Sequence, residues 1–302
     1  MKTLYIIIII VASAFFCLAQ IPKTTENSFS KFHNKIDDIK NDTDIDKLLD
    51  SISKKQFEVF IVKNKLEIKN KECKEFSEKV QAKSWSKADF DNNGYTDILI
   101  TADNFGISSI VIIDEGKNNF AVKSLTGILS YCSFPSIENV QTQTTIVYHE
   151  FSKFQPTEKR LIYKYGDFIE INDSSETYKI EKIEYKTTGC YGNCSVFEMI
   201  IDSNRQAIYK PFAYNKKKKG TFRGIIKEAQ YQELVGLLSY IDFPNLQDEY
   251  LSGGTDQQNS YLTVTYNGGK IKQVMDYSLD GTFGLRRLHK ILFDLRENQR
   301  WK

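Results

Sequence analysis

The first part of the chain combines helical spacing of apolar residues with a polar lead-in. Residues 43–52 carry apolar positions on one helical face, and Thr43-x-x-Asp46 resembles a capping box. These positions are Ile45, Leu48, Leu49 and Ile52. Phe32, Ile36 and Ile39 have a similar spacing and predict a short amphipathic helix within the polar lead-in, residues 20–42. Residues 57–68 are apolar with a mixed period, which leaves helix and strand open there.

After Trp85 the pattern changes to short runs rich in β-branched and aromatic residues. The predicted strands are 98–101, 107–114, 120–123, 144–151 and 161–171, the last of them broken at Tyr165-Gly166-Asp167. Short runs separated by turn residues predict an antiparallel meander.

The polar stretch 172–176 is the predicted boundary between two domains. Beyond it the pattern predicts strands at 180–186, 196–201, 207–210, 261–266 and 270–277, and helices at 227–240 and 285–295. Asn267-Gly268-Gly269 separates the last two strands and is a strong hairpin signal.

These elements predict an α+β protein without regular βαβ alternation. A β-rich module with an antiparallel meander, residues 43–172, precedes an α+β domain, residues 178–302, whose helices pack on an antiparallel sheet. A length of 302 residues is compatible with two such domains.

The N-terminus has the features of an export signal, because Lys2 precedes an apolar run over residues 4–18 that ends in Ala19. We expect residues 1–19 to be a signal peptide cleaved after Ala19. The run is shorter than the ~20 residues that span a bilayer, so a membrane-spanning protein is not expected. The alternative is a lipoprotein anchored at Cys17, but Phe15 and Phe16 stand where such signals need small residues. A periplasmic or secreted protein is therefore predicted.

The 41 basic and 39 acidic residues nearly balance, which gives no reason to expect a nucleic-acid partner. Four cysteines remain in the exported chain: Cys73, Cys132, Cys190 and Cys194. An even number in an oxidising compartment predicts disulfides, and three pairings are possible. Proximity and the domain boundary favour Cys190 with Cys194 and Cys73 with Cys132.

The stretch ADFDNNGYTDILIT, residues 88–101, carries the clearest candidate chemistry. Asp89, Asp91, Asn93 and Asp97 occupy positions one, three, five and nine of a loop, Gly94 permits a sharp turn, and Tyr95 offers a backbone carbonyl. This spacing predicts a calcium site. The alternative is an Asx-rich turn without metal. An EF-hand is excluded because position twelve is Ile100 instead of a bidentate Glu.

The same stretch resembles the calcium loop of FG-GAP and VCBS repeats, in which a D-x-D-x-x-G-x-x-D loop joins two strands. The resemblance implies the same five ligands: Asp89, Asp91, Asn93, the Tyr95 carbonyl and Asp97. Such repeats normally occur in series, and the chain has a single copy, so a propeller is not predicted.

From about Tyr178 to the end, the chain is similar to a bacterial family catalogued as domain of unknown function 6438. The motifs that carry the similarity are Cys190-x-Gly192-x-Cys194, Ile241-Asp242-Phe243, Asp248-Glu249-Tyr250, Thr255-Asp256, Asn267-Gly268-Gly269 and Arg300-Trp301. The family usually has Pro after the second Cys, where this chain has Ser195. The resemblance implies architecture and export but no activity.

Three classes of function remain. No HExxH, triad or G-x-S-x-G pattern surrounds His33, His149 or His289, so the sequence favours a non-enzymatic protein that binds an unknown ligand at the cell envelope. A hydrolase is the first alternative, and its candidate carboxylates are Asp242, Asp248, Glu249 and Asp256. A thiol-disulfide protein using Cys190 and Cys194 is the second.

Overall fold

A computed structural model describes residues 31–57, 68, 70–103, 107–127, 132–140, 143–152, 155–173, 176–216, 219–251 and 254–302. The predicted signal peptide, residues 1–19, and the predicted lead-in as far as residue 30 lie outside this range. So do most of residues 57–68, where the sequence left helix and strand open.

The elements that precede residue 173, which we call the first module, include two four-stranded antiparallel sheets with the strand orders β1-β2-β3-β4 and β5-β6-β7-β8. Its elements are α1 (Asp42–Phe57), α2 (Lys71–Lys79), β1 (Trp85–Ala88), β2 (Asp97–Asp103), β3 (Ile107–Asp114), β4 (Phe120–Ser124), β5 (Ser133–Val140), β6 (Gln143–Ser152), β7 (Gln155–Lys164) and β8 (Asp167–Glu170).

The first sheet is buried on both faces. Ile98 and Ile100 of β2 join Ile45 and other residues of α1 in one hydrophobic cluster. Leu99, between them, joins a second cluster with Ile146 of the other sheet. Because successive side chains of a strand point to opposite faces, a continuous apolar run suits a strand covered on both sides.

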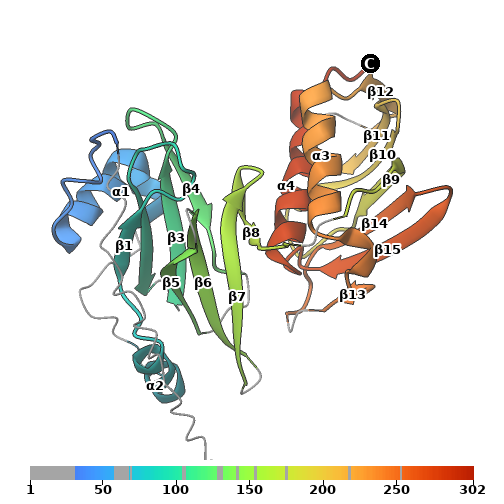
Figure 1. Ribbon diagram of the computed structural model, residues 1–302. Helices are drawn as coiled ribbons and strands as arrows, with labels where there is room; N and C mark the ends of the chain where they lie inside the picture. The colour runs from blue at the N-terminus through green and yellow to red at the C-terminus, as the bar shows by residue number, and fades with distance from the viewer. Residues whose placement is uncertain are drawn as a thin grey trace, which may run out of the picture.

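The elements from β9 onward, which we call the second module, include one seven-stranded sheet in the order β12-β11-β10-β9-β14-β15-β13. Its elements are β9 (Ile180–Thr187), β10 (Val196–Asp202), β11 (Gln206–Ala213), β12 (Phe222–Ile225), α3 (Glu228–Tyr240), the 3₁₀ turn η1 (Phe243–Asn245), β13 (Glu249–Tyr250), β14 (Asn259–Tyr266), β15 (Lys270–Tyr277) and α4 (Phe283–Asn298). All pairings are antiparallel except that of β13 with β15. Figure 1 shows α3 and α4 on one face of this sheet, on the side of the first module.

The protein is therefore β-rich and built on antiparallel sheets, as the sequence indicated. Every predicted strand corresponds to an observed one, and the break at residues 165–167 separates β7 from β8. The helix α2, the strands β1, β5, β12 and β13, and the turn η1 were not predicted. Most of these unpredicted elements are short, and several carry more polar than apolar residues.

The predicted amphipathic helix through Phe32, Ile36 and Ile39 is wrong. Residues 35–38 form a turn instead, and Phe32 pairs with Tyr95 through an isolated bridge. The cause is the Asn34 side chain, whose Oδ1 accepts the backbone N–H groups of Ile36 and Asp37. Such local side-chain bonds compete with a helix.

The predicted start of the next helix, at Thr43, is also wrong: α1 begins one residue earlier, at Asp42. Asn41 has the capping contact, since its Oδ1 accepts the N–H of Asp44 at 3.2 Å. Thr43 therefore lies within the first turn.

The two modules share their hydrophobic clusters. Phe283, the first residue of α4, belongs to the cluster between the two sheets of the first module. Conversely, Ile162 and Ile169 of the first module belong to the cluster under α3 and α4. The modules consequently pack as a continuous body.

Candidate functional site

The acidic loop, residues 89–96, joins β1 to β2 and is folded around the carboxylate of Asp89. Oδ1 of Asp89 accepts the N–H of Asn93 at 3.2 Å, and Oδ2 accepts the N–H of Gly94 at 2.8 Å. Asn92 and Gly94 have φ values of +59° and +88°. Glycine and asparagine tolerate this left-handed region better than other residues, which explains the N-N-G sequence at the turn.

Two carboxylates of the loop and that of Asp97, the first residue of β2, approach one another closely. One oxygen from each of Asp89, Asp91 and Asp97 lies within 4.8 Å of the others. Burial raises the pKa of Asp97 to about 8, although its oxygens accept the N–H groups of Phe90 and Asp114 at 2.8 Å. Burial, supported by the charge of Asp89, raises the pKa of Asp91 to about 6. These carboxylates are packed at a cost in electrostatic free energy.

The other two predicted ligands, Asn93 and Tyr95, are adjacent to this group, and Asn93 contacts it directly. The Asn93 amide donates to Oδ2 of Asp91 at 3.0 Å and to the carbonyl of Asp114 at 2.7 Å, while its oxygen accepts the Tyr95 N–H. The Tyr95 ring packs on Phe32 with centroids 5.1 Å apart. The loop thus brings together three of the five predicted ligands as an oxygen-only donor set, the type that calcium and magnesium take.

Both predicted disulfides are confirmed. Cys73 of α2 is bonded to Cys132, and both are buried with Phe76 and Phe134. Cys190 and Cys194 are bonded with their Cα atoms 5.7 Å apart.

A second candidate site lies at the junction of the modules, where Glu170 of β8 contacts the N-terminus of α4. Its Oε1 accepts the N–H of Phe283 at 2.8 Å and its Oε2 accepts the N–H of Gly284 at 2.9 Å. The first N–H groups of a helix have no partner within the helix, and a carboxylate there also interacts favourably with the helix dipole. The first module therefore caps a helix of the second.

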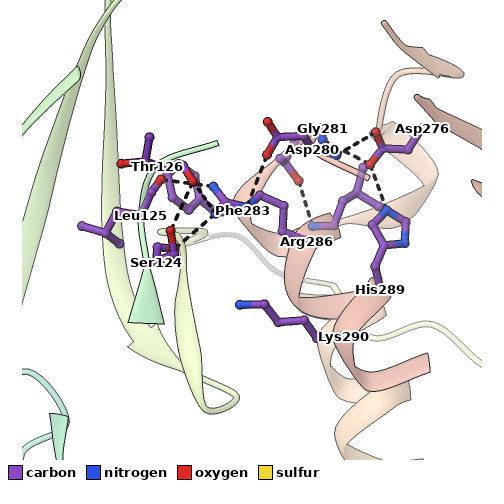
Figure 2. Close-up of polar contacts among 12 residues, drawn as sticks. Ser124, Leu125, Thr126, Asp276, Asp280, Gly281, Phe283, Arg286, His289 and Lys290 are labelled. Carbon is purple, nitrogen blue, oxygen red and sulfur yellow. Dashed lines mark hydrogen bonds and ion pairs between the residues drawn. The ribbon is translucent and has the colours of Figure 1, made fainter. Parts of the chain in front are cut away.

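Arg286 extends this junction to the end of β4. Figure 2 shows its guanidinium directed at the backbone of Ser124, Leu125 and Thr126, and the carbonyls of these residues accept its N–H groups at 3.1 to 3.4 Å. Nε of Arg286 lies 3.5 Å from Oδ1 of Asp280. One turn further along α4, Lys290 donates to Asp167 of β8 at 2.5 Å.

A cavity of about 530 Å³ adjoins these contacts. Thr126 and Gly127 line it from the first module, and Leu279, Asp280 and Phe293 are among the residues lining it from the second. Ligand sites commonly have volumes of about 300–1,000 Å³ and often lie between domains. Both the size and the position of this cavity match that description.

A buried polar network supports the second-module wall of the cavity. His289 accepts or donates a hydrogen bond at each ring nitrogen, with Tyr185 at 2.9 Å and with Asp276 at 2.9 Å. The Asp276 carboxylate also accepts the N–H groups of Asp280 and Gly281 at 3.2 and 3.1 Å. Burial raises the pKa of Tyr185. The network therefore fixes the loop that follows β15.

The same loop has an uncommon backbone. Ser278 and Leu279 are consecutive non-glycine residues with φ values of +74° and +57°. This region is disfavoured for a bulky residue such as leucine, and such strain concentrates at functional sites. Both residues line the cavity. The strain lies at the surface that a ligand in the cavity would contact.

A family model matches one part of the chain. Residues 181–296 match a domain of unknown function (DUF6438). This matched domain supplies Arg286, His289 and the rest of the second-module wall, whereas Glu170 and residues 124–127 lie outside it. Neither a curated protein nor a solved structure matches the chain. No helix among the described residues is both long enough and apolar enough to cross a membrane.

Two of the four carboxylates of the hydrolase alternative have partners of their own. Asp242 accepts from Tyr178 and Asn245, and Asp248 is paired with Lys272. The Asp256 carbonyl accepts the N–H of Tyr191 beside the short disulfide. Among the described residues, the acidic cluster whose oxygens converge is the one in the acidic loop.

His149 lies between Ser136 and Glu158, at 3.2 Å and 3.6 Å, in the order of a hydrolytic triad. The second distance is too long for a hydrogen bond, and Glu158 also faces Arg160 at 3.2 Å. Burial lowers the pKa of His149. We interpret this group as a polar cluster across three strands.

Sequence reasoning missed the residues of the junction. Glu170 and Arg286 carry no motif, and their partners are more than a hundred residues away in the chain. His289 did give a signal, because it shares an apolar helical face with Leu285, Leu288 and Leu292. A histidine at such a position needs buried polar partners.

Proposed function

We propose that this protein is an exported, non-enzymatic binding protein of the cell envelope that takes a ligand in the cavity between its modules. The observation that carries the proposal is the cavity itself, which has walls from both modules and a strained loop at its surface. Export is supported by the two disulfides, because such bonds persist in oxidising compartments.

The cavity is suited to a polar ligand without a large net charge. Lys290 and Arg287, two of its cations, are already paired with Asp167 and Glu233. Arg286 is engaged by backbone carbonyls. A ligand would therefore meet paired cations, the exposed carboxylate of Asp294, the ring of Phe293 and the hydroxyl of Thr126, which also accepts the N–H of Ser109 at 2.6 Å.

The test is a thermal-shift screen of the full-length protein against neutral polar compounds, among them monosaccharides and small peptides. Compounds that raise the Tm of the wild type should have no effect on Thr126→Trp, which fills the cavity. Thr221→Trp is the matched control, since Thr221 is exposed on the second module. Equal responses of both variants would place the ligand elsewhere.

Calcium in the acidic loop is the second part of the proposal. A cation would offset the mutual repulsion of Asp89, Asp91 and Asp97, whose oxygens lie within 4.8 Å of one another. Extracellular calcium modules bind with dissociation constants of about 10⁻⁴ to 10⁻³ M. Millimolar calcium should therefore raise the Tm, and chelator should lower it.

Asp91→Ala should abolish this calcium response, and Asp50→Ala, at an exposed position on α1, should retain it. A wild-type Tm that is the same in calcium and in chelator would refute the calcium proposal. It would leave the proposal for the cavity intact.

Thiol-disulfide exchange is a second candidate, favoured by the exposure of the loop between Cys190 and Cys194. Tyr191 in this loop is 94% exposed. The carbonyl of Ser195, the residue after Cys194, accepts hydrogen bonds from the side chains of Thr187 and Gln258. These bonds anchor the end of the loop independently of the disulfide. A thiol titration against redox buffers tests this candidate. Reduction only at potentials below about −300 mV would mark the bond as structural.

A further inference from the structure

The two edge strands of the seven-stranded sheet differ in how far their backbone groups are hydrogen-bonded. At the β12 edge, Arg223 and Lys302 exchange backbone hydrogen bonds of 2.8 and 2.9 Å, so the C-terminus covers that strand. At the other edge, β13 is only two residues long and pairs with Met275 and Asp276 at the end of β15. The preceding part of β15 therefore forms the edge of the sheet.

The hydrogen-bond pattern identifies the open backbone groups. Met275 donates its N–H to the carbonyl of Asp248, so its backbone groups point away from β14. Because this direction alternates along a strand, Ile271 and Gln273 also direct their N–H and C=O groups to the open side. No segment within the described ranges pairs with them there. Such an edge is a template for another strand.

A hollow of about 710 Å³ lies beside these groups, lined by residues of β14, β15 and the start of β13. Ile271 is 64% exposed and Tyr261 is 43% exposed, and both line the hollow. A strand added at the edge would place alternate side chains against this apolar surface.

The charged residues at the end of the hollow indicate which charge a bound segment would carry. Lys272 is paired with Asp248 at 2.6 Å and its side chain is only 14% exposed. Glu249 is exposed, and no cation among the described residues contacts it. The hollow therefore presents a carboxylate that a basic side chain would complement.

We propose that β15 binds an extended, basic segment of another protein by strand addition, with main-chain hydrogen bonds to Ile271 and Gln273 and a Lys or Arg beside Glu249. A second copy of this chain is the other occupant that an open edge strand could pair with, and sedimentation of the wild type and of Gln273→Pro distinguishes the two. This site is separate from the cavity between the modules.

The experiment uses the full-length protein and a fluorescent peptide of the sequence Lys-Val-Thr-Val-Lys-Val, with anisotropy as the readout. Two peptides serve as comparisons: one with Glu in place of each Lys, and one N-methylated at alternate residues so that its edge cannot donate hydrogen bonds. Both should bind at least tenfold more weakly than the basic peptide.

Gln273→Pro removes one outward-facing N–H and should weaken binding of the basic peptide at least tenfold, while proline remains tolerated at an edge strand. Gln273→Thr keeps this donor and is the matched control. Glu249→Lys should reverse the preference towards the acidic peptide. The proposal is overturned if the basic peptide does not bind, if Gln273→Pro and Gln273→Thr bind it equally, or if sedimentation shows a dimer that Gln273→Pro dissociates.

Discussion

Glu170 is the most direct test of how the modules are joined, and we predict that Glu170→Ala lowers the free energy of unfolding by about 2–4 kcal/mol. The carboxylate accepts the N–H groups of Phe283 and Gly284 at 2.8 and 2.9 Å. Hydrogen bonds to a charged group contribute about 1.5–3 kcal/mol each, and the helix dipole adds about 0.3–1 kcal/mol. The two bonds share one partly exposed carboxylate, so their contributions do not add in full.

Urea unfolding followed by tryptophan fluorescence and by circular dichroism measures this change. Glu228→Ala is the matched control, because Glu228 lies in the first turn of α3 but is 61% exposed and paired with Arg205. An exposed pair contributes about 0–1 kcal/mol. If Glu170→Ala were no more destabilising than this control, the capping of α4 by the first module would be refuted.

Three further changes follow from buried contacts. Phe283→Ala should cost about 3–5 kcal/mol in urea unfolding, because the ring is 6% exposed within the cluster of the first module, and a loss under ~1 kcal/mol would contradict that packing. His289→Leu should lower the free energy of unfolding by about 2–5 kcal/mol, because the buried side chains of Asp276 and Tyr185 each lose a hydrogen bond. An unchanged unfolding midpoint would show that the network is dispensable. Replacing Cys73 and Cys132 with serine should cost about 4 kcal/mol by the chain-entropy relation for their separation of 59 residues, and an unchanged thermal unfolding curve would argue against it.

The local pattern was sufficient for the strands whose burial is regular. Residues 107–114 were predicted as a strand and form β3 with the same bounds. The apolar character of this strand follows from packing on both faces of the first sheet. In contrast, β5 is buried at Ser133 and ends in the exposed residues Glu138, Asn139 and Val140, so burial decreases along the strand. A strand that leaves the core in this way has neither alternation nor a continuous apolar run to reveal it.

The candidate sites also differ in whether their residues are close in sequence. The acidic loop was predictable in outline because Asp89, Asp91 and Asp97 are close in sequence and their convergence needs only one turn at Gly94. The cavity was not predictable, since its walls meet through Glu170 and Arg286, whose partners are brought near by the packing of whole modules. Spacing along the chain carries no information about such contacts.

The acidic loop and the cavity between the modules are connected by packed side chains. Phe90 belongs to the acidic loop and packs edge-on against Phe168, with ring centroids 5.5 Å apart. Asp167, the neighbour of Phe168 in β8, accepts the hydrogen bond of Lys290 on the cavity wall. Asp97, one of the proposed calcium ligands, accepts the N–H of Phe90 at 2.8 Å, so the candidate ion site and the wall of the cavity belong to one continuous chain of contacts through β8.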